Sequence, residues 1–404
     1  MSNKVSFFSK KPSKVSIFFS KWQAFLKIFI IFVKFRLPQP LPTMLLFFAR
    51  LLSLPYAFIL WLRHKAYDWG ICKRISFDFP VLSIGNITVG GTGKTPHTEY
   101  IINMYKDEMP LAVLSRGYKR HSKGFRYVHA NDNVKDTGDE PLQIKRKFPN
   151  IQVAVHANRI EGIRQLKKDH PQLRLIILDD AFQYRRLKPT LSLLLSDFTR
   201  SYTKDTLLPF GRLRDLPSRS LHADFIVVSK SPPNMTPIAR RIKMKEVHPQ
   251  PYQPLFFTRY VYGTPLPLFP KLAEPLPSKA QQGRGIALSG IAHATAFVEH
   301  IQNTYGLQTR LSFPDHHTFS AADIETINQA AKSNPKSFIF TTEKDSTRLH
   351  GQKKLSARAK AALYYIPIEV AFFSPQAQAQ FKQQLSQRLF CQTALPQKLR
   401  IPQH

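Results

Sequence analysis

Short apolar runs separated by longer mixed segments dominate the middle of the chain. Such a run, four or five residues long and bounded by turn residues, is typical of a strand buried on both faces. The runs are Val81–Ile84, Leu111–Leu114, Ile151–Val155, Leu175–Leu178, Leu191–Leu195 and Phe225–Val228. Segments with helical spacing lie between them, and this alternation predicts a mostly parallel sheet covered by helices, with ligands at the carboxyl ends of the strands. Residues 71–250 are therefore expected to form an α/β domain.

The pattern changes near residue 250. Residues 255–262 alternate aromatic with other side chains ahead of Gly263, which predicts a β-hairpin connector, followed by a linker, within residues 251–284. A second alternation then predicts a smaller α/β domain over residues 285–392. Its expected strands are Gly285–Gly290, Ser337–Thr341 and Tyr364–Val370. Residues 393–404 are expected to form a frayed tail.

The first 43 residues combine apolar side chains with basic ones. They carry eight Lys and Arg residues and no Asp or Glu. This composition predicts a basic amphipathic extension that lies on an anionic membrane. Met44 is an alternative start of the protein, and in that case residues 1–43 would not be translated.

The next segment is more continuously apolar. Residues 44–62 contain one charged side chain, Arg50, and one proline, Pro55. The length approaches the roughly 20 residues that a membrane span needs. Arg50 and Pro55 favour instead a kinked helix that lies in the membrane interface. We expect a membrane-associated helix over residues 44–70 and leave spanning and interfacial positions open, beside the alternative of a core helix packed on the catalytic domain.

Charge and composition limit the kinds of partner and the cellular compartment that the protein can have. The 404 residues include 59 Lys and Arg against 26 Asp and Glu, a formal net charge of +33. Such an excess favours an anionic partner, namely a nucleic acid, an anionic membrane or a phosphorylated substrate, unless it only keeps the protein soluble. Two cysteines, Cys72 and Cys391, make neither a disulfide framework nor a zinc site, which fits a reducing compartment.

A glycine-rich segment, Phe79–Thr98, has the order expected of a phosphate-binding loop: a strand, a tight turn and a helix start. In such a loop backbone N–H groups surround a polyphosphate, Lys94 reaches its terminal phosphates, and the Thr95 hydroxyl binds Mg²⁺. The expected nucleotide-binding residues are Thr88, Val89, Gly90, Gly91, Thr92, Gly93, Lys94 and Thr95. Thr88 stands where the usual pattern has glycine, and an ordinary strand–turn–helix connection is the alternative.

Acidic side chains are scarce, so their clusters are informative. Asp179 and Asp180 follow a predicted strand, where an acid beside a phosphate-binding loop holds Mg²⁺ or its water. Asp139 and Glu140 open a predicted helix, where a carboxylate could accept a proton from an attacking hydroxyl or bind metal. Either pair could instead cap a helix.

Histidine and arginine side chains add candidates in loops. His316 follows Asp315 in a loop of the second domain, and such a histidine can orient a carboxylate or stabilise charge, although a lone histidine is more often structural. Arginine forks suit phosphate oxygens, and some will simply belong to a solvated surface. The loop arginines are Arg116, Arg159, Arg212, Arg214 and Arg219.

Taken together, the motifs resemble those of the tetraacyldisaccharide 4'-kinase family, over residues from about 45 to 375. The matching segments, in chain order, are Gly85–Pro96, Leu114–Tyr118, Gly138–Pro141, Asn158–Arg159, Leu178–Gln183, Leu208–Asp215, Phe313–His316 and Thr342–Asp345. Thr88 fits this family, while Ala181 stands where its members commonly have glycine. Residues 1–43 have no counterpart in the resemblance.

The resemblance implies a function and a set of roles. ATP with Mg²⁺ would phosphorylate the 4'-hydroxyl of a tetraacylated glucosamine disaccharide 1-phosphate, giving lipid IVA at the cytoplasmic face of the inner membrane. Asp139 would be the general base, paired with His316, and two α/β lobes joined by a β-hairpin would enclose the nucleotide. The phosphate ligands implied are Lys94, Thr95 and Arg212, and the metal and proton-handling residues are Thr95, Glu140, Asp179 and Asp180. The substrate-binding residues implied are Asn86, Arg116, Arg159, Gln183 and Arg212.

A regulatory or nucleic-acid-coupled NTPase is the rival interpretation, because a phosphate-binding loop and a high positive charge permit it. The sequence contains no RNA-recognition core, and the apolar segment 44–62 fits an acylated substrate better. We therefore expect no nucleic-acid partner, a membrane-associated P-loop kinase, and a monomer.

Overall fold

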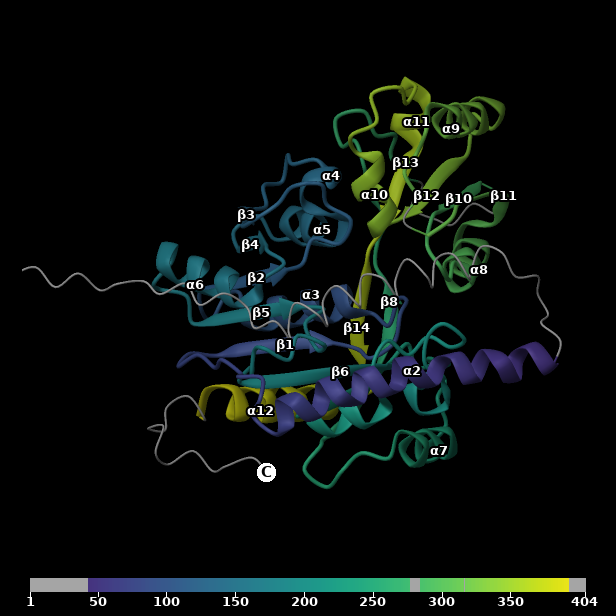
Figure 1. Cartoon of the computed structure of the whole chain (residues 1–404). Helices are drawn as coiled ribbons and strands as arrows, with labels where there is room; N and C mark the ends of the chain where they lie inside the picture. Colours follow the sequence, from purple (N-terminus) through teal and green to yellow (C-terminus); the bar gives the residue numbers. More distant parts are fainter. Residues whose placement is uncertain (1–42, 277–283, 316, 392–404) are drawn as a thin grey trace, which may run out of the picture.

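The computed structural model describes residues 43–276, 284–315 and 317–391 (Figure 1). Almost all of the expected N-terminal extension, the tail 393–404 and His316 therefore lie outside the described residues. Two lobes are visible, each built around its own sheet, and two strands run between them.

The larger sheet contains nine strands within the described residues. In spatial order they are β14 (Ile368–Phe372), β8 (Leu255–Tyr262), β7 (Phe225–Ser229), β6 (Leu191–Asp197), β1 (Val81–Gly85), β5 (Leu175–Asp179), β2 (Leu111–Ser115), β4 (Gln152–Val155) and β3 (Arg126–Tyr127). All neighbours are parallel except at the two edges, β14 and β3. The strands expected from the apolar runs between residues 81 and 228 are all present and form the centre of this sheet.

Helices cover both faces of the larger sheet, as the apolar runs require. Because side chains alternate along a strand, one face packs against α3, α5 and α12, and the other against α6 and α7. The helices of this lobe, besides α2, are α3 (Lys94–Tyr105), α4 (Val134–Thr137), α5 (Asp139–Lys147), α6 (Arg159–Asp169), α7 (Pro237–Val247) and α12 (Pro375–Ser386), with short 3₁₀ turns at Tyr202–Lys204 and Pro217–His222 and a π turn at Gln387–Cys391.

In the part of the chain that the structure describes, the smaller lobe has a five-stranded sheet that is parallel except for β9. Its order is β11 (Leu307–Ser312), β10 (Gly285–Ser289), β12 (Phe338–Thr342), β13 (Leu363–Ile366) and β9 (Leu266–Pro267). Its helices are α8 (Thr295–Tyr305), α9 (Ala321–Ser333), α10 (Glu343–Leu349) and α11 (Ala357–Ala362).

Among the described residues of the segment 251–284, the expected hairpin does not form. β8 pairs instead with β14, more than a hundred residues later, in an antiparallel register that joins Tyr262 to Ile368. Phe256 and Phe257 are buried in the larger sheet, which explains the alternating pattern without a hairpin partner nearby. The ribbon of β8 and β14 links the two lobes (Figure 1).

The apolar run Tyr364–Val370, expected as one strand, is two strands in different sheets. Pro367 separates β13 of the smaller lobe from β14 of the larger lobe. The chain therefore returns to the larger lobe before α12, and the smaller domain expected over residues 285–392 ends near Ile366.

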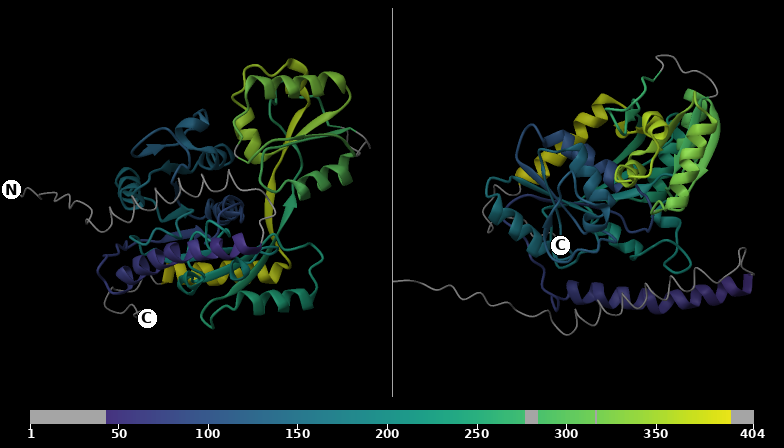
Figure 2. Two further views of the ribbon diagram at one scale, coloured as in Figure 1. Left: turned by 45° about the vertical axis from the view of Figure 1, so that its right-hand side comes forward. Right: turned by 90° about the horizontal axis from the view of Figure 1, so that it is seen from above.

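Helix α2 (Thr43–Asp68) runs for 26 residues along one side of the larger lobe (Figure 2). It continues through Pro55, where the sequence predicted a kink. Tyr56 and Leu60 are buried against Leu208. Among the helices of the described part of the chain, none has the length and apolar character to cross a bilayer.

Candidate functional site

The phosphate-binding loop joins β1 to α3 as the sequence predicted. Gly90 and Gly93 have φ angles of 104° and 89°, a region that glycine adopts freely. A Cβ atom on Gly93 would lie 1.9 Å from the hydroxyl of Tyr260 on β8, so a side chain there would also collide. Thr88, at the position where glycine is usual, forms an isolated bridge with Leu213 instead.

Asn86 and Gln183 lie at the base of this loop. Asn86 is fully buried, and its amide donates to the hydroxyls of Thr88, at 3.3 Å, and Thr92, at 2.6 Å. The Gln183 amide donates to the Asn86 carbonyl oxygen. These amides are thus used inside the protein to hold the loop, and the predicted contact of both residues with substrate stays a prediction.

Lys94 opens α3 and faces the acids at the end of β5. Its Nζ atom lies 4.0 Å from Asp180 Oδ2, and Arg214 Nη1 donates to the same oxygen at 3.0 Å. Burial by itself raises the pKa of Asp180, but Arg214 and Lys94 overcome this and hold that pKa well below its usual range. Asp180 is therefore a permanent carboxylate between two cations.

The neighbouring acids respond in the opposite direction. Asp179 is completely buried, and burial together with the charges of Glu140 and Asp180 raises its pKa to about 7. Burial also raises the pKa of Glu140, and Asp139 and Asp180 add to the rise while Lys94 opposes it. Three acids, Glu140, Asp179 and Asp180, therefore lie around the helix start that carries Lys94 and Thr95, and this cluster is the candidate phosphate-transfer site.

The donor set fits a magnesium ion that is held mainly by phosphates and water. Asp179 Oδ1 accepts a hydrogen bond from Thr98 at 3.4 Å, whereas Oδ2 is buried with no hydrogen-bond partner among the described residues. No group of three or more acidic, histidine or cysteine side chains in that part of the chain is arranged to hold a metal alone. Mg²⁺ commonly uses only one or two protein carboxylates beside a nucleotide.

Asp139, the predicted general base, begins α5 and is 6% exposed. Its Oδ2 accepts from Arg348 Nη2 of α10 at 2.5 Å, so a residue of the smaller lobe contacts the carboxylate. Arg348 also donates to Asp345 at 2.9 Å. The predicted partner His316 lies outside the described residues, and the dyad stays a prediction.

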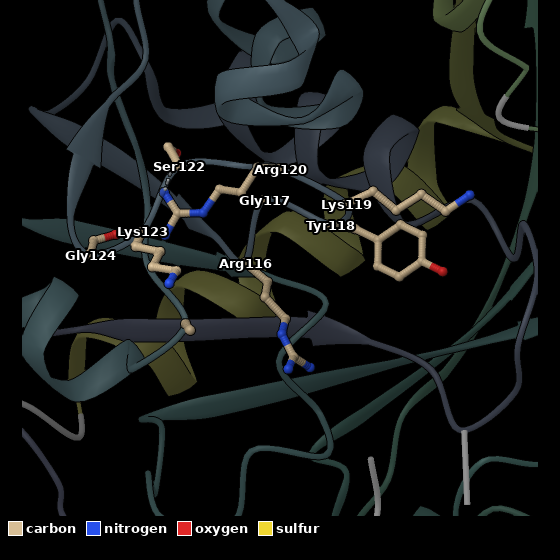
Figure 3. Close-up of a pocket in the computed structure, with 9 residues that line it drawn as sticks. Arg116, Gly117, Tyr118, Lys119, Arg120, Ser122, Lys123 and Gly124 are labelled. Atoms are coloured by element: carbon tan, nitrogen blue, oxygen red, sulfur yellow. Dashed lines mark hydrogen bonds between the residues drawn. The ribbon is translucent and has the colours of Figure 1, made fainter. Parts of the chain in front are cut away.

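Arg116 directly follows β2, and Arg159 begins α6 with its Nη2 3.5 Å from the carbonyl oxygen of Asp179. Arg159 is 3% exposed, and burial beside Arg116 lowers its pKa to about 10. Arg116 is exposed and lines a pocket of about 420 Å³ (Figure 3). The remaining lining residues are Gly117, Tyr118, Lys119, Arg120, Ser122, Lys123, Gly124 and Ala157.

This pocket adjoins the phosphate-transfer site. Gly117 packs so closely on Gly138, the residue before Asp139, that a Cβ on Gly138 would lie 3.3 Å from Gly117 Cα. Figure 3 shows Arg120 turned toward Ser122 and Arg116 pointing away from it. The pocket is therefore an open, basic extension of the site.

Arg212, a predicted phosphate ligand, lies between the lobes. Its backbone carbonyl accepts from Val89 N at 2.7 Å, which joins its loop to the phosphate-binding loop. Its guanidinium lies 3.2 Å from His293 Nε2 of the smaller lobe. Arg212 thus contacts both lobes beside Gly90.

Two residues of this site were not assigned to it by the sequence. Arg214 was only one of several loop arginines, and its clamp on Asp180 depends on how its loop folds against β5. Arg348 lies 209 residues from Asp139 and one helical turn after the Thr342–Asp345 motif. That motif was the one available signal for Arg348.

Known proteins resemble the chain over most of its length. The family model described as tetraacyldisaccharide-1-P 4'-kinase matches residues 45–389. The tetraacyldisaccharide 4'-kinase of Phocaeicola vulgatus is 44% identical over 321 residues, covering 78% of this chain and 88% of the relative. That of Bacteroides thetaiotaomicron is 40% identical over 341 residues, covering 82% and 90%.

One solved structure is also similar. It is the "apo" form of LpxK from Aquifex aeolicus in complex with ATP. The two chains superpose with a TM-score of 0.63 at 26% sequence identity, over 84% of this chain and 99% of the other. The match therefore extends over almost the whole of that protein.

Proposed function

Since the chain belongs to the tetraacyldisaccharide-1-P 4'-kinase family, and is thus an ATP-dependent 4'-kinase of lipid A synthesis, we propose a role for each residue of the site in that reaction. The observation that carries the proposal is the convergence of Glu140, Asp179 and Asp180 on Lys94 at the start of α3, with Asp139 adjacent to Glu140. The acceptor is a tetraacylated glucosamine disaccharide 1-phosphate and the product is lipid IVA.

The phosphate-binding loop holds the triphosphate of ATP. Residues 88–95 supply backbone N–H groups and the N-terminus of α3, both of which favour anions. Lys94 neutralises charge on the transferred phosphoryl group, and Arg212 binds phosphate oxygens from the opposite side. Asp180 keeps the Lys94 ammonium aimed at this position.

Thr95, Asp179 and Glu140 are the residues that would hold Mg²⁺. The metal would supply charge neutralisation between the phosphates. The Oδ2 atom of Asp179, buried and without a hydrogen-bond partner among the described residues, supports this assignment. Burial, together with neighbouring acids, also raises the pKa values of Asp179 and Glu140, which favours a cation beside them.

Asp139 accepts the proton of the 4'-hydroxyl as the oxygen attacks phosphorus. Its position at the start of α5, beside Glu140 and the phosphate-binding loop, supports this role. Pairing of Asp139 with His316 rests on the resemblance to the family. For the proton transfer to occur, Asp139 must share or exchange its contact with Arg348.

The basic pocket beside Asp139 binds the 1-phosphate end of the acceptor. Arg116, Lys119 and Lys123 line it, and Arg159 lies next to Arg116. A bidentate or point-charge contact with phosphate suits these side chains. The acceptor then spans from this pocket to Lys94.

Helix α2 holds the enzyme, as a monomer, on the cytoplasmic face of the inner membrane. Leu54, Phe58 and Trp61 form an exposed apolar stripe, 43–59% exposed, with Phe58 and Trp61 stacked on each other. Trp69 and Ile71 continue it beyond the helix. Such a stripe suits the interface of an anionic bilayer, where the acyl chains of the substrate are buried.

Transfer of radiolabel from γ-labelled ATP decides between this function and its rival. The expected result is label in the disaccharide lipid, with release to water at least about 100-fold slower than transfer. Label released mainly as inorganic phosphate, whether or not the lipid is present, would instead favour a regulatory NTPase. A Lys94→Ala variant, purified in the same way, controls for contaminating kinases.

A further inference from the structure

Helix α2 contacts the loops of the phosphate-transfer site through a polar network on its inner face, in which Tyr56 and His64 are buried and Asp68 is exposed. Four of its side chains bind two loops, one that contains Gln183 and Arg185 and one that contains Arg214 and Asp215. Tyr56 donates to the Arg214 carbonyl at 2.9 Å, and Arg63 donates to the Gln183 carbonyl at 3.0 Å. The remaining two, His64 and Asp68, contact Asp215 and Arg185.

The centre of the network is His64, which is 6% exposed. Arg185 Nη1 lies 3.0 Å from His64 Nδ1, and a guanidinium can only donate, so Nδ1 is the acceptor. The ring hydrogen is therefore on Nε2, which donates to Asp215 Oδ1 at 2.5 Å. Burial lowers the pKa of His64 further than the hydrogen bond to Asp215 raises it, which keeps this neutral form.

Asp215 links this contact to Arg214. Asp215 is fully buried, and its Oδ1 also accepts from Leu216 N at 2.9 Å. Its Oδ2 has no hydrogen-bond partner within the described residues, so its orientation depends on the His64 and Leu216 contacts at Oδ1. Asp215 is adjacent to Arg214, whose backbone N–H donates to Ile87 O at 2.9 Å.

Arg214 in turn fixes Asp180. Its guanidinium binds both carboxylate oxygens of Asp180 and the side chain of Asn86. Asp180 has a φ angle of 51°, a conformation that a non-glycine residue keeps only when its contacts hold it. The path from α2 to the acid beside Lys94 is therefore made of consecutive contacts.

We propose that His64 is a positioning residue for phosphoryl transfer, which acts through Asp215 and Arg214 to hold Asp180 in line with Lys94. The inference rests on the proposed role of Asp180 and deepens it. Helix α2 is then part of the catalytic framework as well as the membrane contact, and its docking on the larger lobe sets the geometry of the site.

The variants His64→Leu and His64→Gln test this. Leucine fills similar space without a donor or acceptor, whereas the glutamine amide can donate to Asp215 and accept from Arg185. With detergent-dispersed acceptor, His64→Leu should lower kcat at least about 10-fold, because a displacement of about 1 Å is enough for such losses. The KM for ATP should change less than about 3-fold, and His64→Gln should recover most of kcat.

Gln253→Leu is the matched control. Gln253 is 5% exposed and donates to two backbone carbonyls, of Ser220 and Ala223, without reaching Arg214. This variant should lose Tm to a similar extent and keep the kcat of the parent per folded molecule. If His64→Leu behaves like Gln253→Leu, or if His64→Gln is as slow as His64→Leu, the positioning role is wrong.

Asp180→Asn separates this inference from the function on which it rests. If Asp180→Asn keeps full turnover, the role of Asp180 itself fails. If Asp180→Asn is slow while His64→Leu turns over normally, only the positioning by His64 fails. The expected result is that both are slow and that His64→Leu adds less than about 3-fold to Asp180→Asn, since both act on one contact.

Discussion

At the scale of single residues, the pKa values of two adjacent acids in the site are shifted in opposite directions. Asp179 and Asp180 follow the same strand, yet burial and neighbouring acids raise the pKa of Asp179 to about 7, while Arg214 and Lys94 hold that of Asp180 well below its usual range. An acid that stays charged is suited to orient Lys94. An acid whose pKa is raised by burial and by other acids is suited to bind a metal cation.

Lys94→Ala and Thr95→Ala should both lose activity for different reasons. The first removes charge stabilisation of the transferred group, and the second removes a hydroxyl proposed to bind Mg²⁺. Raising the concentration of Mg²⁺ should therefore restore part of the activity of Thr95→Ala and little of that of Lys94→Ala. Initial rates measured across a magnesium titration check this, and equal insensitivity would contradict the metal role of Thr95.

Asp139→Asn and His316→Ala should each lower kcat about 100-fold or more, with a modest change in the KM for ATP. If the two residues act as one unit, the double variant should be far less impaired than the product of the single effects. Because Asp139 also pairs with Arg348, turnover must be expressed per folded molecule. Fully multiplicative losses at unchanged stability would place the residues in separate roles.

Asp224 should make the protein less stable as the pH rises from about 4 to 6. Burial raises its pKa to about 6 although it accepts a hydrogen bond from Ser192 N at 2.7 Å. The folded state therefore holds this proton at pH values where the unfolded chain, with a pKa near 3.8, has lost it. Asp224→Asn should remove this loss of stability. The Tm of the variant minus the Tm of the parent should therefore increase by a few degrees between pH 4 and pH 7. A difference that does not vary with pH would contradict the assignment.

Residues that follow from local sequence were predictable, whereas partners from distant segments were not. Lys94 and Thr95 are set by a strand, a turn and a helix start that are contiguous in the chain. Arg348 reaches Asp139 only because the two lobes meet, and Arg214 reaches Asp180 only because its loop lies over β5. Asn86 was only partly predictable. The sequence placed it in a motif, but it did not show that the side chain is buried.

At the scale of elements, α2 has two faces with different tasks. Its outer stripe of Leu54, Phe58 and Trp61 is exposed, while its inner face carries Tyr56 and His64 in contact with the site loops. The sequence predicted the helix from its apolar content. It could not predict the inner contacts, because an apolar run does not say which polar side chains meet a partner. The same limit explains the mistaken hairpin, since alternation along β8 does not identify β14 as its neighbour.

Replacing Leu54, Phe58 and Trp61 with serine should weaken membrane binding without removing the inner contacts of α2. The fraction that sediments with anionic vesicles should fall at least about 10-fold, because each large apolar side chain contributes on the order of 2 kcal/mol when buried. Turnover of detergent-dispersed acceptor should stay near that of the parent. The matched control replaces Ile238 and Ile242 of α7, which are 73% and 58% exposed, and should sediment normally. Equal sedimentation of both variants would contradict the anchor role of α2.

At the scale of the whole molecule, the two lobes are joined by the β8–β14 ribbon and by ion pairs across their interface. Lys147 of α5 binds Glu99 in its own lobe at 2.6 Å and Glu343 of α10 at 3.0 Å. Burial, and then the charge of Glu343, raises the pKa of Glu99 to about 7. Arg212 and Arg348 add contacts at the phosphate-binding loop and at Asp139. Arg212 and Arg348 therefore contact the site and join the lobes at the same time.

Arg348→Ala should loosen the contact between the lobes more than its single side chain suggests. Arg348 is paired with Asp139 and Asp345, and the side chains of all three are at most 7% exposed. Removing the cation leaves two buried carboxylates without it, and breaking a buried pair in this way costs about 3–5 kcal/mol. The expected result is a clear fall in Tm, with faster hydrogen exchange in α5 and α10 than elsewhere.

Lys382→Ala, which breaks an exposed pair with Glu108, should cost less than about 1 kcal/mol of folding free energy and leave both helices protected from exchange. If Arg348→Ala is no less stable than Lys382→Ala, or if its added exchange is spread evenly over both lobes, the Asp139–Arg348 contact does not hold the lobes together. The ribbon and the remaining contacts, such as Lys147–Glu343, would then set their arrangement.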